Sequence, residues 1–250
     1  MSLLRVESVS RRFGNLVAVD TVSMVVEPGE LRAVIGPNGA GKTTFFNLIS
    51  GFLKPTAGRI RFRDEDVTDV MPAKRVWLGM ARTFQVTEIF PELSVGENLR
   101  IAVEVAAGYR LRPWVGRDAD AALRARIDEL LAMAKIADKR HRLAGELSHG
   151  DQRATEIMMA LALKPQLLLL DEPTAGMGDQ ETYDITQLIR SLHRDHKLSI
   201  VLIEHDMRVV FHLADRIMVL AEGRMLAEGT PKEIAASELV QAAYLGKAAA

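Results

Sequence analysis

The residues best suited to chemistry are a run of glycines that ends in a lysine and a threonine. This run follows the apolar stretch Leu31–Ile35 and leads into a helical pattern. Glycine lets the backbone wrap closely, so that successive N–H groups and a helix N-terminus point at an anion. Lys42 is placed to reach the outer phosphates of a nucleotide, and the Thr43 hydroxyl to bind Mg²⁺. The sequence therefore predicts a site for ATP with Mg²⁺, formed by Gly36, Pro37, Asn38, Gly39, Ala40, Gly41, Lys42, Thr43 and Thr44.

Two adjacent carboxylates form a second candidate. Asp171 and Glu172 follow four consecutive leucines, Leu167–Leu170, which places them at the carboxyl end of a buried strand. Open α/β sheets hold their ligands at that edge. Asp171 suits the coordination shell of Mg²⁺, and Glu172 suits a general base for an attacking water. Alone, an acidic strand end before the turn residue Pro173 is the simpler interpretation, but together with the phosphate loop the pair favours hydrolysis.

The elements that must position these groups form an α/β pattern. Consecutive apolar residues in several short runs predict strands buried on both faces, as in a parallel sheet. Between residues 92 and 159 strand signals are absent, and residues 118–137 show apolar residues at helical spacing. We therefore expect one domain over residues 1–250, with an α/β core (1–91 and 160–250) and an inserted helical part (92–159). The predicted strands are Val22–Val26, Leu31–Ile35, Leu167–Leu170, Ser199–Ile203 and Ile217–Leu220.

Composition argues against several kinds of partner. The chain has 32 basic and 33 acidic residues and a formal charge of −1, which gives no overall attraction for nucleic acid. It contains no cysteine, which excludes disulfides and thiolate metal sites and fits a reducing compartment. Charged residues interrupt the first 14 positions, where a secretory signal needs an apolar core. No apolar run approaches the ~20 residues of a membrane-spanning helix, so we expect any membrane role to depend on a partner.

A third motif, Leu147 to Gln152, reads LSHGDQ and resembles the LSGGQ signature of the ABC ATPases, with the order and spacing of that family. In that family two cassettes pack head to tail, and the signature of one contacts the ATP held by the other. The resemblance implies that Ser148 and the Gly150 N–H contact the γ-phosphate in trans, which suits a hydroxyl at a helix N-terminus. His149 and Asp151 depart from the pattern, and we predict that Asp151 caps the following helix.

Three further residues fall where ABC ATPases place functional groups. The resemblance implies that Gln85 contacts Mg²⁺ and the attacking water, that His205 contacts the γ-phosphate, and that Phe13 stacks on adenine. Taken alone, Gln85 is an ordinary surface residue, His205 a loop histidine and Phe13 a core aromatic. Their order along one chain favours the functional interpretation. Residues 174–179 match the loop that contacts the partner cassette.

The resemblance covers nearly the whole chain and implies its fold and partners. The expected fold is an α/β P-loop NTPase cassette, with a RecA-like, mostly parallel core sheet, an antiparallel β region and an inserted helical subdomain. Several segments further resemble the ATPases of branched-chain amino acid importers. That group implies two membrane permease subunits, a second cassette, a solute-binding protein and a peripheral location at the cytoplasmic face of the membrane. The segments are Ala81–Gln85, Tyr109–Asp118, Ile203–Met207, Gly229–Pro231 and Ala243–Gly246.

Other functions stay open from the sequence. ATPases of lipopolysaccharide or other lipid transport are similar in sequence, and relatives of the importer group serve amides, urea or aromatic acids. An ABC ATPase of DNA repair or translation is disfavoured, because such proteins usually carry a coiled coil, zinc cysteines or two cassettes. A regulatory subunit that hydrolyses poorly is suggested by His149, Asp151, Gly178 and Asp179. The importer group favours a heterodimer of cassettes over a homodimer.

Overall fold

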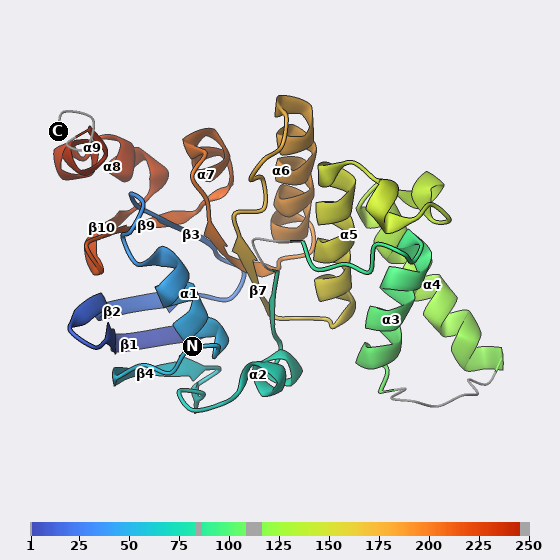
Figure 1. The fold of residues 1–250 in the computed structure, drawn as a ribbon, viewed down its shortest axis with the longest axis horizontal. Helices are drawn as coiled ribbons and strands as arrows, with labels where there is room; N and C mark the ends of the chain where they lie inside the picture. Colours follow the sequence, from blue (N-terminus) through green and yellow to red (C-terminus); the bar gives the residue numbers. More distant parts are fainter. Residues whose placement is uncertain (1, 84–86, 109–116, 246–250) are drawn as a thin grey trace.

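The computed structural model describes residues 2–83, 87–108 and 117–245, and its strands form two sheets (Figure 1). The larger sheet contains β3 (Leu31–Ile35), β6 (Met80–Arg82), β7 (Leu167–Asp171), β8 (Ser199–Ile203), β9 (Arg216–Ala221) and β10 (Arg224–Gly229). Its strand order is β10-β9-β3-β8-β7-β6. The smaller sheet contains β1 (Leu4–Phe13), β2 (Leu16–Val26), β4 (Ala57–Phe62) and β5 (Glu65–Asp66), in the order β2-β1-β4-β5.

The centre of the larger sheet is parallel and fully buried. Every residue of β3, β7 and β8 is buried, which is the pattern of strands covered on both faces. The registers are parallel, with Leu31 beside Ile200 and Leu167 beside Ser199. Only β10 runs antiparallel, against β9. The predicted α/β fold with a mostly parallel core sheet is confirmed.

The smaller sheet is the antiparallel β region. Its strands pair β1 with β2 and with β4, both antiparallel. The predicted strand Val22–Val26 is the second half of β2, where Val22, Met24 and Val26 are buried and the residues between them are exposed. This strand therefore has one buried face, in contrast to the central strands of the larger sheet.

Helix α1 (Lys42–Ser50) lies between the two sheets (Figure 1). Its Phe45 and Phe46 are fully buried in a hydrophobic cluster that also contains Val22 of the smaller sheet and Leu169 of the larger. The C-terminus of α1 is held by the buried guanidinium group of Arg75, which donates to the carbonyl oxygens of Leu48 and Ile49. The helix that follows the phosphate loop is thus fixed along its whole length.

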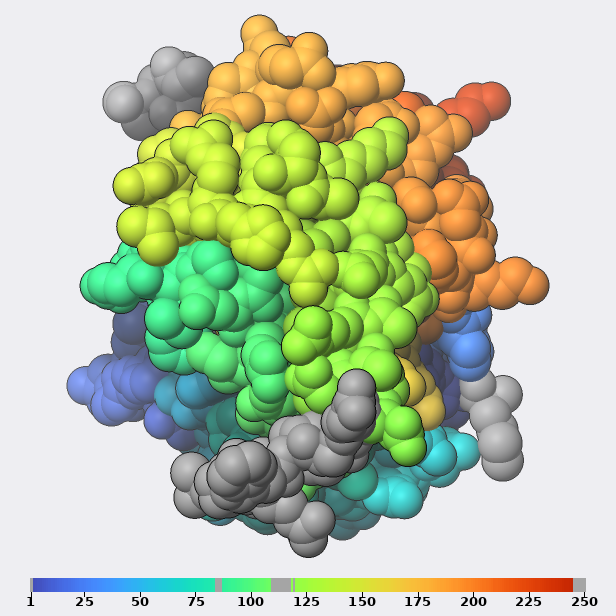
Figure 2. All heavy atoms as spheres, turned by 90° about the vertical axis from the view of Figure 1, so that its right-hand side faces the viewer, coloured from blue at the N-terminus to red at the C-terminus, as the bar shows by residue number. Residues whose placement is uncertain are grey.

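The opposite face of the larger sheet is covered by other helices. These are α5 (His149–Ala162), α6 (Asp179–Arg194) and α7 (Met207–Leu213), which contribute to one hydrophobic cluster. Helix α3 (Val95–Ala106) belongs to the same cluster and packs against α5. Helices α3 and α4 (Arg117–Met133) form much of the end of the molecule that faces the viewer in Figure 2, and α5 contacts both of them. Short helices complete the chain: α2 (Pro72–Leu78), η1 (Ala137–Lys139), η2 (Ala144–Glu146), α8 (Pro231–Ala235) and α9 (Glu238–Leu245).

The start of α5 differs from the prediction. The N-cap is Ser148, whose hydroxyl accepts a hydrogen bond from the Asp151 N–H at 3.3 Å. The prediction that Asp151 caps this helix is wrong, because the helix begins three residues earlier and Asp151 lies in its first turn. The Asp151 carboxylate instead forms an ion pair with Lys139, whose Nζ lies 2.7 Å from both oxygens.

The described part of the chain contains no helix long and apolar enough to cross a membrane.

Candidate nucleotide-binding site

Residues 38–44 of the predicted phosphate loop meet Glu172 and His205 at the carboxyl ends of β3, β7 and β8, which are neighbours in the larger sheet. They surround a cavity of about 530 Å³. The cavity is lined by the phosphate loop, by Glu172 and His205, by residues 16–18 of β2 and by the β9–β10 turn at Glu222 and Gly223. Contributions from β2 and from that turn were missed by the sequence analysis, because neither carries a recognisable motif.

The phosphate loop depends on glycine at two tight contacts. Gly41 has a φ of 95°, and a Cβ atom there would lie 2.4 Å from the Ala18 carbonyl oxygen. A Cβ atom on Gly36 would lie 2.1 Å from the Leu220 carbonyl oxygen. Any side chain at these positions would displace the loop from the strands behind it. The loop therefore holds its curved path only with glycine at these positions.

Lys42 extends back along the loop. Its Nζ donates to the carbonyl oxygens of Gly36 at 2.7 Å and Pro37 at 3.1 Å. Burial lowers the pKa of Lys42, and the carboxylates of Glu172 and Asp171 act in the opposite direction. The ammonium group thus lies between the loop and the acidic strand end, where it can contact the outer phosphates of a nucleotide.

Asp171 is buried at the end of β7 and forms an ion pair with Arg82. The Arg82 Nη2 donates to Asp171 Oδ2 at 2.8 Å, and only 8% and 4% of the two side chains are exposed. Burial raises the pKa of Asp171, and Arg82 partly counteracts this effect. Arg82 also donates to Asn47 Oδ1 at 2.6 Å and Ser50 Oγ at 2.7 Å, on α1. This arginine therefore connects the strand end that carries Asp171 with the helix that follows the phosphate loop.

The side chains of Glu172 and His205 are in direct contact, and both residues line the cavity. The Glu172 Oε1 lies 2.7 Å from the His205 Nε2, although 33 positions separate the two residues. Glu172 adopts a left-handed backbone conformation with a φ of 47°, which is uncommon for a residue with a side chain. Its N–H donates to the Ile203 carbonyl oxygen at 2.9 Å, so the turn is fixed against β8. This arrangement directs a carboxylate and an imidazole at the same point near the phosphate loop.

The remaining predicted residues lie elsewhere. Phe13 ends β1 and is 43% exposed, with the Arg11 guanidinium group 4.7 Å from its ring centre, and it is not among the residues lining the cavity. Ser148 and Gly150 lie at the N-terminus of α5, outside that lining. There the Gly150 N–H donates to Glu181 Oε1 at 3.0 Å, a carboxylate contact that the sequence did not predict. Gln85 and most of the segment 109–118 lie outside the described residues.

A phosphate loop, an acidic strand end and a facing histidine on neighbouring parallel strands define the class of this protein as a P-loop nucleotide-binding ATPase. The sequence profile described as "ABC transporter" matches residues 19–175, and the chain therefore belongs to the ABC transporter ATP-binding family. A second profile, "Branched-chain amino acid ATP-binding cassette transporter", matches residues 224–250.

Similar proteins match over almost the whole chain. The high-affinity branched-chain amino acid transport ATP-binding protein LivG of Escherichia coli K12 is 40% identical over 252 residues, which is 98% of this chain and 98% of that protein. The corresponding protein BraF of Pseudomonas aeruginosa is 38% identical, with the same coverage. The solved structure of an ABC transporter cassette in its ADP conformation is 30% identical, with a TM-score of 0.86 over 98% of this chain and 99% of that chain.

Proposed function

We propose that this chain is the ATP-hydrolysing subunit of an importer for branched-chain amino acids or related compounds. The observation that carries the proposal is that Lys42 and the Glu172–His205 pair line one cavity at the end of the parallel sheet. A phosphate-binding loop and a general base are the two parts that ATP hydrolysis requires. The similarity to LivG and BraF supports the choice of cargo.

The residues at the cavity fit a magnesium ion. Mg²⁺ prefers hard oxygen ligands and is commonly bound by one or two protein oxygens together with phosphates and waters. The Thr43 hydroxyl, at the first turn of α1, and the Asp171 carboxylate are such oxygens, and Gln85 is proposed as a further contact. When bound, the metal would neutralise charge on the phosphates. The Arg82 ion pair acts against the rise in the pKa of Asp171 that burial causes, and so favours the ionised form that this role requires.

Hydrolysis is assigned to Glu172 and His205. The Glu172 carboxylate accepts a proton from a water as the water oxygen bonds to the γ-phosphorus and ADP departs. His205 holds the Glu172 carboxylate and contacts the γ-phosphate, while Lys42 and the loop N–H groups stabilise the phosphate oxygens. Phe13 is proposed to stack on the adenine.

Two cassettes are needed to complete each site. Ser148 and the Gly150 N–H lie outside the cavity of their own chain, and we assign them to the γ-phosphate of a nucleotide held by a second cassette. ATP would then close the dimer, and hydrolysis would open it. We propose a second, similar chain as the partner, with residues 92–159 as the helical subdomain that moves with the permeases. The chain would lie at the cytoplasmic face of the membrane, bound to two permeases that receive cargo from a solute-binding protein.

The test of hydrolysis is Glu172→Gln, which keeps the shape of the side chain and removes the base. We expect turnover to fall below a hundredth of that of the native chain, with ATP affinity unchanged. When the variant is mixed with the second cassette and ATP, a dimer of the two chains should accumulate in size-exclusion chromatography with light scattering. Glu65→Gln, on the exposed strand β5 of the smaller sheet, is the control. Turnover retained in Glu172→Gln would exclude the assigned base.

The test of transport is co-purification from native membranes followed by mass spectrometry. Two permeases, a second cassette and a solute-binding protein are expected. Recovery of lipid-transport proteins would instead support the alternative of a lipid or lipopolysaccharide transporter. Self-association without a second cassette would overturn the heterodimer.

A further inference from the structure

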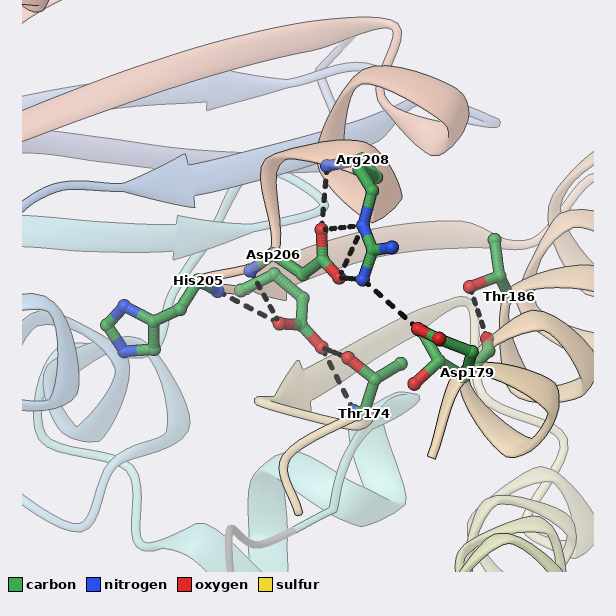
Figure 3. Close-up of polar contacts among 8 residues, drawn as sticks. Thr174, Asp179, Thr186, His205, Asp206 and Arg208 are labelled. Atoms are coloured by element: carbon green, nitrogen blue, oxygen red, sulfur yellow. Dashed lines mark hydrogen bonds and ion pairs between the residues drawn. The ribbon is translucent and has the colours of Figure 1, made fainter. Parts of the chain in front are cut away.

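Glu204 is a buried carboxylate next to the proposed catalytic pair. It follows β8 directly, precedes His205 and is 3% exposed. Four donors converge on it (Figure 3). Thr174 donates to Oε1 from its N–H at 2.9 Å and from its hydroxyl at 2.5 Å. The N–H groups of His205 and Asp206 donate to Oε2 at 2.9 and 3.4 Å.

The two oxygens of Glu204 serve two different loops. Oε2 binds the loop that carries His205, and Oε1 binds Thr174, two residues beyond Glu172 in the loop after β7. The side chains of Glu172 and His205 meet 2.7 Å apart at the cavity. In Figure 3 the His205 ring points away from Thr174 and Asp206. The ring contacts Glu172 and the backbone N–H contacts Glu204, so the two loops are joined at two separate places. Glu204 forms the inner of these two connections.

The chemistry of the connection requires a carboxylate. Each of the four contacts is a donor, so the site needs a group that only accepts, and a glutamine would present its own N–H₂ to one pair of donors. Within the described residues no basic side chain forms an ion pair with Glu204, and hydrogen bonds alone compensate its burial. Burying a charge in this way is costly unless every bond is made. An apolar residue would be the simpler choice for packing alone.

We propose that Glu204 is a positioning residue for ATP hydrolysis, which fixes the loop of His205 against the loop of Glu172 so that the two side chains meet. The inference rests on the proposed function of Glu172 and His205. The inference also concerns residues 174–179, because Thr174 is the first residue of the loop that we expect to contact the partner cassette. Through Glu204, the position of that loop would determine where His205 lies.

A shift of about 1 Å in a catalytic group lowers turnover by up to about a hundredfold. We therefore expect Glu204→Gln to lower kcat about 10- to 100-fold. The phosphate loop is untouched, so the affinity for ADP and the KM for ATP should stay within about twofold of the native values. Thr174→Val removes one of the donors and should lower kcat by a smaller factor, whereas Thr174→Ser keeps the hydroxyl and should restore it.

Each variant would be compared by kcat, KM, fluorescent ADP binding and melting temperature. Glu233→Gln is the control for the hydrogen bonds, because the exposed Glu233 also accepts from the N–H and hydroxyl of a threonine, Thr230, and is not among the residues lining the cavity. A double variant with Glu172→Gln should be no slower than Glu172→Gln alone, because residues that act as a unit are not additive. The inference is supported if kcat falls in Glu204→Gln and in Thr174→Val but stays near the native value in Thr174→Ser and in the control.

Two results would overturn the role of Glu204 alone. The first is native turnover in Glu204→Gln while Glu172→Gln is inactive, which leaves the proposed function intact and removes only the role of Glu204. The second is a parallel loss of nucleotide affinity, melting temperature and kcat, which indicates general loosening of the fold. If Glu204→Gln does not fold, Thr174→Val and Thr174→Ser decide the question by the same criteria. Turnover retained in Glu172→Gln would reject the proposed function itself, and the inference with it.

Discussion

Replacing Arg82 by methionine tests the electrostatics of the site. The substitution keeps the length of the side chain but removes the guanidinium group with which the buried Asp171 carboxylate forms its ion pair. For unit charges 2.8 Å apart and an effective dielectric constant of about 20, Coulomb's law gives roughly 6 kcal/mol. Desolvation of the guanidinium group opposes this attraction and offsets about half of it. We expect the free energy of unfolding to fall by about 3 kcal/mol, which lies at the lower end of the range for broken buried pairs.

The assay is urea denaturation of the nucleotide-free protein, followed by circular dichroism. Arg100→Met is the control, because Arg100 pairs with Glu104 while 45% and 30% of the two side chains are exposed, and such pairs contribute less than about 1 kcal/mol. Asp171→Asn completes a double-mutant cycle with Arg82→Met. The double variant should be more stable than the sum of the single effects by at least about 1.5 kcal/mol. A loss below about 1 kcal/mol in Arg82→Met, or additive effects, would refute this account of the site.

The same variant has a defined pH dependence. Burial already raises the pKa of Asp171 above its ordinary value of 3.8, and removing Arg82 raises it further. The folded state then binds a proton at a higher pH than the unfolded state does. The loss of folding stability caused by the ionised Asp171 carboxylate is complete above the folded pKa. It becomes smaller as the pH falls towards 3.8, because the folded state then binds a proton. The stability difference between Arg82→Met and the native chain, measured by the same urea denaturation, should therefore shrink as the pH falls from above the raised folded pKa towards 3.8.

Other substitutions test the phosphate loop, helix α1 that follows it, and the contact of Gly150 in the signature motif. Arg75→Met should lower the free energy of unfolding by about 3 kcal/mol in urea denaturation, because buried carbonyls at the end of α1 lose their donor. Gly41→Ala should weaken fluorescent ADP binding more than about tenfold, since its Cβ meets a carbonyl oxygen at 2.4 Å. Glu181→Gln, in the Glu172→Gln background, should strengthen the ATP-dependent dimer several-fold in light scattering, because it removes a negative charge beside the Gly150 N–H. A weaker dimer would contradict that reasoning.

Much of the larger sheet could be predicted because its strands are locally distinctive. The predicted runs Leu31–Ile35 and Ser199–Ile203 are the observed strands β3 and β8, since a strand buried on both faces is apolar throughout. Strand β1 was not predicted. It carries charged residues on its solvent face, and shifts of register near Val9 interrupt the alternation that would have revealed it. Such a strand becomes recognisable only beside its partners β2 and β4.

The residues of the candidate site could likewise be predicted only where a local motif marks them. The phosphate loop and the Asp171–Glu172 pair are local motifs, so their residue types and spacing were sufficient to find them. Arg82 was not singled out, because its ion pair spans 89 positions and no local pattern marks it. Glu204 binds a residue 30 positions away. The start of α5 was misplaced because Ser148 and Asp151 are both good capping residues, and the contact of Asp151 with Lys139 was not visible in the sequence.

The order of strands in the larger sheet has a consequence for how the protein is made. Strand β3 is completed at Ile35, but its neighbours β8 and β9 end at Ile203 and Ala221. At about 5–20 residues per second, synthesis of the 168 residues between Ile35 and Ile203 takes about 10–30 s. During that time five residues destined for the centre of the sheet have neither neighbouring strand, and the phosphate loop has no opposing histidine. Nascent chains of this protein should therefore depend on chaperones until β8 leaves the ribosome, and ATP would bind only to chains that have passed that point.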